Sequence, residues 1–521
     1  MGSDGSWAKL PTATHTRISR RKTNIIATML TKQDEQDLAR RGKTVEETER
    51  QFAMIAKGFA PAAVRRAATV GDGIIRVSDD EAMRLAKEYD AELSKGLSVA
   101  KFVPASGAAS RMFKPLHQYL AADKDGKAKM EGEEPMRTFF SRLDDFAFAD
   151  QLRALNPADK AETVRLVLAD DGLAYGSHPK GLVTFHKYAD GTTRTAAEEH
   201  LAEAEAYCLS GGRSHVHYTV PVGMESAFRT KLAPTLEKSG GKIDVSFSVQ
   251  PPATDVPCLT LDGKPARDAG GHLIFRPGGH GALIGNLGKI DADAVFVKNN
   301  DNVSHGRMLS ESSVWKKVIA AIGLGLKREV DKLLNRLAAG DAAAADDGIA
   351  FIEGKMKVSV PQEIKSSGKD RKSAFVETFL DRPLRVCGMV KNEGEPGGGP
   401  FWVEGKDGIS TLQIVESAQM DLDDPEVKAI VGGSTHFNPV DLFCCMKDRN
   451  GEKYDLQKFV DYDACFQTHK SVNGVDVTGM ELPGLWNGAM AKWLTMFVEV
   501  PIITFTPVKT VMDLLRPVHQ A

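Results

Sequence analysis

An apolar segment that ends in polar, oxygen-bearing side chains is the feature that most constrains the fold of this chain. Residues 294–298 (AVFVK) predict a strand, and Asn299, Asp301 and Asn302 follow it directly. A carboxylate at the carboxyl end of a strand is well placed to hold a hard cation that bridges phosphates. Just before this strand, residues 275–282 (FRPGGHGA) are rich in glycine, which lets backbone amides approach a nucleotide because no Cβ intervenes. In this order, the two segments predict a site for a nucleoside triphosphate and a magnesium ion.

Predicted strands and helices alternate along the chain. Apolar segments predict strands at residues 98–104, 215–220 and 244–250, with helical segments between them. Thr195 and Glu198 have the spacing of a capping box, which predicts the start of a helix. The alternation predicts an α/β fold with a mixed, mostly parallel sheet covered by helices, and a site at the carboxyl ends of its strands.

Length and local pattern suggest how the chain is divided. Its 521 residues allow one large domain with insertions, or several smaller domains. Residues 1–28 lack the long apolar core of a signal peptide and predict a disordered leader. Residues 29–97 predict an N-terminal helical segment. Residues 98–521 predict the main domain, with helical insertions at 121–172 and 310–375.

Composition excludes several classes of partner. A formal net charge of -3 provides no field that would attract nucleic acid or an acidic membrane surface. No stretch approaches the roughly 20 apolar residues that a membrane span requires. The six cysteines form no CxxC pair, which favours buried, reduced thiols and predicts a cytoplasmic protein. The number of subunits stays open.

Six short segments occur in a fixed order along the chain. They are residues 106–112 (SGAASRM), 179–180 (PK), Gln250, residues 279–281 (GHG), residues 296–303 (FVKNNDNV) and residues 507–515 (PVKTVMDLL). In this order they resemble the UDP-sugar pyrophosphorylase group of nucleotidyltransferases. The last two segments are the most specific, and a set of ordered motifs is much harder to obtain by chance than one motif. The chain also resembles an uncharacterised bacterial family of the same superfamily, known only as a domain of unknown function.

This resemblance implies a nucleotidyltransferase fold of the GT-A type and a magnesium-dependent reaction. The oxygen of a sugar 1-phosphate would attack the α-phosphorus of a nucleoside triphosphate and release pyrophosphate. Such a transfer needs positioning and neutralisation of charge more than covalent help from the protein. By the resemblance, Lys180, Lys509 and Arg111 bind phosphates, and Asp301 is the magnesium ligand.

The resemblance also assigns binding roles to the remaining candidates. The nucleotide loop is formed by Ser106, Gly107 and Ala108, and Gly279 and His280 belong to the element beside the base. Gln250 and Gly281 resemble elements that bind uridine, which favours UTP as the nucleotide. Hydroxyl groups need both donors and acceptors. The candidates for the sugar are Asn299, Glu416 and Asn438.

Two other functions fit parts of the same pattern. A GT-A-type glycosyltransferase uses a similar sheet and acidic strand end, but transfers the sugar itself. A regulatory protein that binds nucleotide sugars without turnover is suggested by Gly107-Ala108-Ala109, where family members usually have Gly-x-Gly. Taken alone, Asp301 between asparagines also fits a simple turn, and Lys509 also fits an ordinary solvated lysine. Lys180 and Lys509 together favour the pyrophosphorylase.

Overall fold

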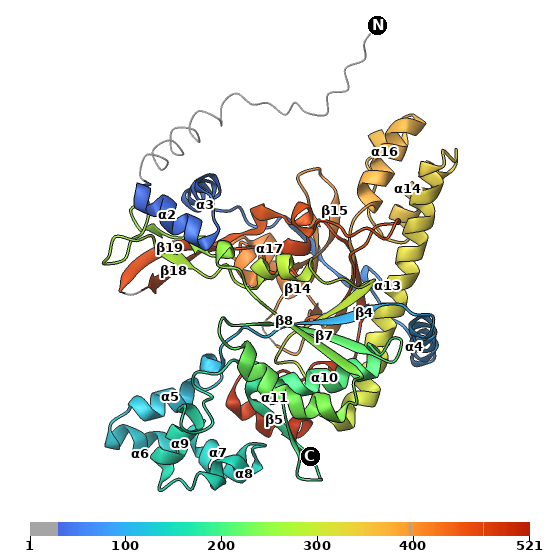
Figure 1. Cartoon of the computed structure of the whole chain (residues 1–521). Coiled ribbons are helices and arrows are strands. Elements are labelled where there is room, and N and C mark those ends of the chain that lie inside the picture. The colour runs from blue at the N-terminus through green and yellow to red at the C-terminus, as the bar shows by residue number, and fades with distance from the viewer. Residues whose placement is uncertain (1–29, 395–396, 473) are drawn as a thin grey trace. The chain divides into compact units, whose positions relative to one another are not determined.

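The computed structural model describes residues 30–394, 397–472 and 474–521 (Figure 1). The predicted leader, residues 1–28, lies outside the described residues. The described residues form two compact units. The smaller unit comprises residues 30–62, 251–282 and 460–489, and the larger one residues 63–250, 283–459 and 490–521.

A 10-stranded sheet forms the centre of the larger unit. Every strand along its main path runs in the same direction except β17, which is antiparallel to both of its neighbours. This confirms the predicted mixed, mostly parallel sheet. The strand order is β2 (Thr69–Val70), β3 (Gly73–Ile75), β20 (Leu494–Glu499), β13 (Leu384–Lys391), β17 (Asp441–Cys445), β12 (Ala294–Lys298), β4 (Val99–Pro104), β7 (Ser214–Val220) and β8 (Ile243–Val249), and β16 (His436–Phe437) pairs with β13.

The common direction of the strands brings distant parts of the chain to one edge. The carboxyl ends of β4, β8, β12 and β20 lie at the same edge, and the antiparallel β17 begins there. The chain segments that leave or enter these strands therefore lie near one another, although they are far apart in sequence. Ligands of open α/β sheets bind at this edge.

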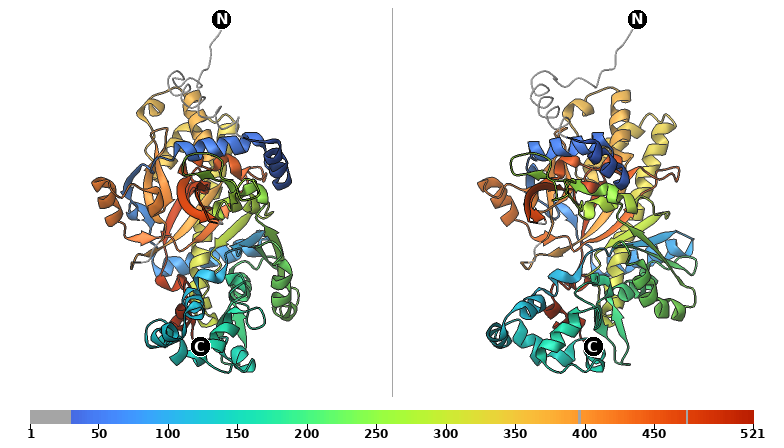
Figure 2. Two further views of the ribbon diagram at one scale, coloured as in Figure 1. Left: turned by 90° about the vertical axis from the view of Figure 1, so that its left-hand side faces the viewer. Right: turned by 60° about the vertical axis from the view of Figure 1, so that its left-hand side comes forward.

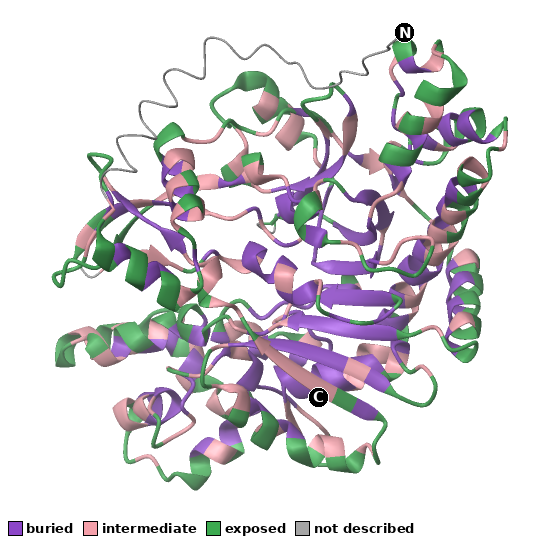
Figure 3. Cartoon of the chain, turned by 45° about the horizontal axis from the view of Figure 1, so that its top comes forward, coloured by how far each residue is buried: buried purple, intermediate pink, exposed green. Residues whose placement is uncertain are grey.

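Helices α4 (Asp79–Ser94), α10 (Ala196–Tyr207), α11 (Glu225–Lys238) and α13 (Leu309–Ala338) pack against one face of the sheet. Tyr89 of α4 makes edge contacts with Phe296 and Phe443 on the strands, at centroid distances of 6.1 Å and 6.4 Å. In α13, a Cβ on Gly323 would lie 2.6 Å from Phe443, so this close packing requires glycine. The strands beneath these helices are mostly buried (Figure 3).

The start of α10 follows the sequence prediction. The Thr195 hydroxyl accepts a hydrogen bond from the Glu198 amide at 3.3 Å, and the Glu198 carboxylate accepts one from the Thr195 amide at 2.8 Å. This reciprocal pair confirms the predicted capping box, which satisfies amides that the first helical turn leaves unpaired. The four strands predicted before residue 300 also occur, as β4, β7, β8 and β12.

The N-terminal segment differs from the prediction of a purely helical region. Helices α2 (Lys32–Arg41), α3 (Val45–Lys57) and α4 are present, but β1 (Val64–Ala67), β2 and β3 lie between α3 and α4. Strand β1 pairs with β14 (Gly399–Glu404), which pairs in turn with β15 (Ser410–Val415). Strands β1 and β3 pair with β14 and β20, which are more than 300 positions away, so a local pattern could not reveal them.

The helical segment predicted at 121–172 shares its core with the end of the chain. Helices α5 (Lys114–Ala121), α6 (Lys124–Gly132), α7 (Met136–Ser141), α8 (Ala149–Ala154) and α9 (Lys160–Leu168) lie beside the C-terminal segment (Figure 1 and Figure 2). Phe139, Phe146 and Phe148 are fully buried with Val508 and Leu514 in one apolar cluster. These helices therefore support the segment that carries Lys509.

Within the segment predicted as an insertion at 310–375, α13 belongs to the core because it packs directly on β13 and β17. The helices that follow, α14 (Ala344–Gly354), α15 (Gln362–Lys365) and α16 (Lys369–Leu380), contact one another. The smaller unit contains α2, α3, β9 (Val256–Pro257), β10 (Leu259–Thr260), β11 (Phe275–Arg276), β18 (Phe466–Val472) and β19 (Val475–Glu481).

Two properties predicted from composition can be compared with the structure. All six cysteines are buried and unpaired, as the sequence predicts. Across the described part of the chain, no helix has both the length and the apolar character needed to cross a membrane.

A buried row of hydrogen bonds that contains two histidines leads us to expect lower stability in acid. His519 hydrogen-bonds His186 at 2.8 Å, and His186 hydrogen-bonds Glu199 at 2.8 Å. Burial, together with the charges of His186 and Arg516, lowers the pKa of His519 to about 3. A histidine in an unfolded chain has a pKa of about 6.5. Below about pH 6.5 the unfolded state therefore binds a proton that the folded state excludes, so stability falls as the pH falls from about 6.5 toward 3.

At pH 5, this one group is expected to lower the free energy of unfolding by about 2 kcal/mol relative to pH 7.5. The variant His519→Gln should lose that part of the pH dependence, measured by urea denaturation at both pH values. His469→Gln, which removes an exposed imidazole, is the control. Equal pH dependence in the wild type and the His519 variant would contradict the prediction.

Candidate active site

Two lysines from distant parts of the larger unit meet on the Asp301 carboxylate. The Lys180 ammonium donates to Asp301 Oδ2 at 3.0 Å, and the Lys509 ammonium donates to the same oxygen at 3.3 Å. Lys180 also donates to the carbonyl of Val508 at 2.9 Å. Asp301 follows β12, at the edge of the sheet where the sequence places the site. The structure thus brings together the predicted phosphate-binding lysines and the predicted metal ligand.

The charge of Asp301 is set by competition between burial and the two lysines. Burial alone would raise the pKa of the Asp301 carboxyl, but the charges and hydrogen bonds of Lys180 and Lys509 hold the pKa below its usual value. The group is therefore ionised at neutral pH. Two ammonium groups and one carboxylate leave a net positive charge at this edge, which favours an anionic ligand.

The donor set at Asp301 fits a magnesium ion. Both lysines bind Oδ2, while Oδ1 accepts no hydrogen bond from the described residues. The Asp301 side chain is 14% exposed. Magnesium in phosphate-transfer sites often takes one or two carboxylates, with water and phosphate oxygens completing the octahedron. Among the described residues, no group of three or more His, Cys, Asp or Glu side chains could hold a metal by itself.

The predicted nucleotide loop lies against the Pro179-Lys180 segment. Ala108 and Pro179 form an isolated antiparallel bridge, and the Lys180 amide donates to the Gly107 carbonyl at 3.2 Å. The loop follows β4, and Arg111 lies exposed at its far end. Two motifs that are separated in sequence by the helical segment are therefore adjacent in space.

Asn302 holds the segment that carries Lys509. Its side-chain nitrogen donates to the backbone carbonyls of Pro439 at 3.2 Å and Thr504 at 3.4 Å. Its side-chain oxygen accepts a hydrogen bond from the Thr506 amide at 2.9 Å. The Val508 amide also donates to the Asp301 carbonyl at 3.0 Å. Sequence reasoning placed Asn302 in the motif but missed this bracing role. The available signal was an amide side chain directly after a buried strand.

The predicted sugar-binding residues divide into two groups. Asn299 and Asn438 lie at the same sheet edge as Asp301, because Asn299 leaves β12 and Asn438 precedes the start of β17. The Asn438 side-chain oxygen accepts a hydrogen bond from the Val440 amide at 2.9 Å, whereas its buried side-chain nitrogen has no partner among the described residues. Glu416, at the end of β15, caps a short 3-10 helix (Ser417–Gln419) with its carboxylate.

Asn300, which sequence reasoning did not select, has a similar unsatisfied atom. Its side-chain oxygen is buried without a hydrogen-bond partner among the described residues, and it would lie 3.1 Å from a Cβ placed on Gly181. Buried polar atoms usually have partners. The Asn300 and Asn438 atoms are therefore positions where a substrate hydroxyl or a water is expected.

The predicted base-binding residues lie partly outside the larger unit. Gln250 directly follows β8 in the larger unit, whereas Gly279, His280 and Gly281 belong to the smaller one. A Cβ on Gly281 would lie 2.0 Å from the Pro483 carbonyl, so packing within the smaller unit requires this glycine. The ring of His280 stacks on Trp486 at a centroid distance of 4.2 Å and accepts from the Leu485 amide at 2.9 Å.

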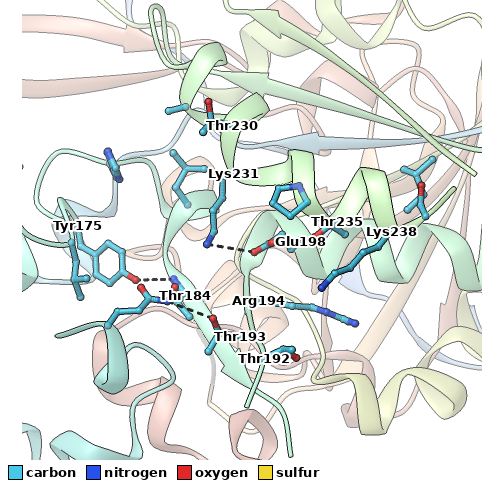
Figure 4. Close-up of a pocket in the computed structure, with 18 of the residues that line it drawn as sticks. Tyr175, Thr184, Thr192, Thr193, Arg194, Glu198, Thr230, Lys231, Thr235 and Lys238 are labelled. Carbon is cyan, nitrogen blue, oxygen red and sulfur yellow. Dashed lines mark hydrogen bonds and ion pairs between the residues drawn. The ribbon is translucent and has the colours of Figure 1, made fainter. Parts of the chain in front are cut away.

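A cavity of about 980 Å³ in the larger unit is a separate feature (Figure 4). It is lined by parts of β6 (Thr193–Thr195), α10 and α11. The Lys231 ammonium points toward the Glu198 carboxylate 4.0 Å away. Leu182 and Thr184 also line it, shortly after Lys180 in the chain. No predicted site residue lines this cavity, so it is not the predicted site.

A family model described as a domain of unknown function (DUF4301) matches residues 31–520. The chain belongs to this family. No curated protein matches the sequence.

Solved structures of two sugar-nucleotide enzymes are similar to the chain. A point mutant of UDP-glucose pyrophosphorylase from Leishmania major, in complex with UDP-glucose, has 15% identity and a TM-score of 0.43, over 94% of this chain and 78% of that chain. The UDP-N-acetylglucosamine pyrophosphorylase from Trypanosoma brucei, in complex with an inhibitor, has 12% identity and a TM-score of 0.45, over 97% of this chain and 85% of that chain.

Replacement of Asn302 is expected to destabilise the site segment. Asn302→Ala removes three hydrogen bonds from a fully buried position and leaves their partners unsatisfied, which should cost about 2 to 4 kcal/mol of unfolding free energy. Asn299→Ala, at a half-buried neighbour, is the matched control and should change stability by less than about 1 kcal/mol. Urea denaturation measures both. Equal losses in the two variants would show that Asn302 does not brace the segment.

Proposed function

We propose that this member of the family is a magnesium-dependent nucleotidyltransferase that joins UTP to a sugar 1-phosphate and releases pyrophosphate. The observation that carries the proposal is the convergence of Lys180 and Lys509 on one oxygen of Asp301, beside the Ser106–Ala108 loop. Two cations and one ionised carboxylate suit a triphosphate that carries magnesium. The sequence resemblance to UDP-sugar pyrophosphorylases supports the same assignment.

The lysines would exchange the carboxylate for phosphate oxygens when substrate binds. Lys509 is 52% exposed and its long side chain can follow a triphosphate tail, whereas Lys180 is 16% exposed and is also held by the Val508 carbonyl. A lysine acts as a compact point charge, which suits phosphate groups that shift during transfer. Release of both lysines leaves Asp301 available to the metal.

The chemical step is an in-line substitution at the α-phosphorus. A phosphate oxygen of the sugar 1-phosphate forms a bond to this phosphorus, and the bond from it to the oxygen that bridges to the β-phosphate breaks. That electron pair leaves with pyrophosphate, so no other reactant is needed. Magnesium held by Asp301 would neutralise charge on the phosphate oxygens, while Lys180, Lys509 and Arg111 orient the groups.

The remaining assignments concern recognition of the two substrates. The backbone of Ser106, Gly107 and Ala108 would contact the nucleotide. Gln250 and Gly281, with Gly279 and His280, would read the uracil, as the sequence resemblance implies. Asn299, Asn438 and Glu416 would bind hydroxyl groups of the sugar, and the unpartnered Asn438 nitrogen supports the role of this residue.

The proposal predicts pyrophosphate release that depends on two substrates together. The purified full chain is incubated with magnesium, each of four nucleoside triphosphates and a panel of sugar 1-phosphates, and pyrophosphate is measured. Release should require UTP and one sugar phosphate. A glycosyltransferase would instead give a free nucleoside diphosphate from a nucleotide sugar, and a regulatory protein would bind nucleotide without turnover; either result would contradict the proposal.

Changes at the central residues are expected to remove turnover without unfolding the protein. Asp301→Asn and Lys509→Ala should each lower kcat/KM by at least about 100-fold, because the first weakens the proposed magnesium site and the second removes a cation that would contact the phosphates. Lys129→Ala, at a lysine that is 75% exposed on α6, is the control and should retain activity. A folded Asp301 or Lys509 variant with the wild-type rate would exclude that residue from catalysis.

A further inference from the structure

A buried carboxylate lies beneath the Asp301 loop. Glu203 is on α10 and is 2% exposed. Its Oε2 accepts hydrogen bonds from Lys101 at 2.7 Å and from the Tyr207 hydroxyl at 3.1 Å. Its Oε1 accepts from the Lys298 ammonium at 2.6 Å and from the Ser304 amide at 3.4 Å. The two carboxylate oxygens thus have different partners, and only Oε1 contacts the residues on either side of the loop 299–303.

The contacts of Oε1 close the loop that carries Asp301. Lys298 is the last residue of β12, and Ser304 follows the loop, so a single oxygen binds both ends of residues 299–303. One turn earlier on α10, His200 hydrogen-bonds the Asn300 carbonyl at 3.3 Å through Nε2. Helix α10 therefore holds the loop at three points. We propose that Glu203, assisted by His200, is a positioning residue that fixes the Asp301 carboxylate for metal and phosphate; this inference rests on the proposed function.

The charges around Glu203 are compatible with this role. Burial alone would raise the pKa of Glu203, but Lys101 and Lys298 hold that pKa well below its usual value. Burial and the nearby Lys101 lower the pKa of His200 well below its usual value, so His200 is neutral. A neutral imidazole donates to the Asn300 carbonyl without adding charge. Glu203 and His200, which together form a clamp on the Asp301 loop, therefore provide one fixed anion and one neutral donor.

A second buried pair completes the network. Lys316 of α13 pairs with Asp441, which lies opposite Lys298 on the neighbouring strand β17. Burial, together with the charge of Lys298, lowers the pKa of Lys316 well below its usual value. Buried ion pairs rarely stabilise a fold more than well-packed apolar residues would, because desolvation offsets their attraction. Their contribution here is geometric, since an apolar side chain cannot bind the Ser304 amide.

Glu203 could instead serve only to pack α10 against the sheet. Variants at Lys101 distinguish this role from the positioning role. Lys101→Met removes a buried ion pair to Oε2 but leaves the contacts of Oε1 to Lys298 and Ser304 in place. The double variant Lys101→Met with Glu203→Leu removes one positive and one negative charge, so the network keeps its wild-type net charge and loses the clamp. Comparing the two variants measures what the Glu203 carboxylate contributes once its pair with Lys101 is absent from both.

Hydrogen–deuterium exchange of the free protein is the direct test. Amides of residues 299–304 in the double variant should exchange about 10-fold faster than in Lys101→Met, with β12 (Ala294–Lys298) as the internal reference. If the double variant does not fold, His200→Phe serves instead, because it removes the bond to the Asn300 carbonyl without changing charge. Faster exchange spread evenly over the sheet, or equal exchange of the loop in both variants, would overturn the proposal.

Turnover gives the second test. The magnesium concentration for half-maximal rate should rise about 10-fold in the clamp variants while the KM for the sugar phosphate stays unchanged, since a role in packing alone would not shift the metal requirement selectively. If the amides of the loop exchange faster in the clamp variants but the protein releases no pyrophosphate, the positioning role of Glu203 stands and the proposed reaction is rejected. Normal turnover and normal loop exchange in the variants would reject the clamp and retain the reaction.

Discussion

The backbone ladder that joins residues 301–302 to residues 507–508 is the constraint on which the site depends. The Val508 amide binds the Asp301 carbonyl at 3.0 Å, and Asn302 and Pro507 form an antiparallel bridge. This contact places Lys509 next to a carboxylate that is 208 positions away in sequence. Val508 and Leu514 also pack in the core of the helical segment between the nucleotide loop and Lys180. That segment therefore supports the site, although it separates two motifs in sequence.

Electrostatics at the sheet edge favour a polyanion. Two ammonium groups share one oxygen of Asp301, so neither has a carboxylate of its own. Opposite charges attract more strongly where water is partly excluded. A polyphosphate that enters this edge would satisfy both lysines and free the carboxylate to bind a divalent cation.

The parts of this structure that local pattern encodes were predictable, and the parts that depend on distant partners were not. The apolar strands and the Thr195–Glu198 capping box have short-range signals, and both occur as expected. The family resemblance that the ordered motifs carry selected Lys180, Asp301 and Lys509, and the structure brings these three side chains together. Strand β1 was missed because it contains two adjacent arginines and forms only by pairing with β14.

Buried charges were also hidden from sequence reasoning. Lys101 and Lys298 each occupy a strand position where a lysine normally suggests exposure to solvent, yet both are buried. Their burial depends on Glu203, which is on a helix whose register against the sheet no local pattern specifies. The bracing role of Asn302 was missed for the same reason, because its partners come from two other segments.

The glycines of residues 279–281 show how a motif and a packing requirement can coincide. The sequence resemblance assigns these glycines to nucleotide binding, whereas the structure gives Gly281 a sufficient reason in the close approach of the Pro483 carbonyl. Gly279 has a φ of 75°, which also favours glycine whatever the function. Their presence therefore does not separate a nucleotide-binding protein from a merely similar fold. Lys180 and Lys509 do bear on that distinction, because neither packing nor backbone conformation requires two cations at one carboxylate oxygen.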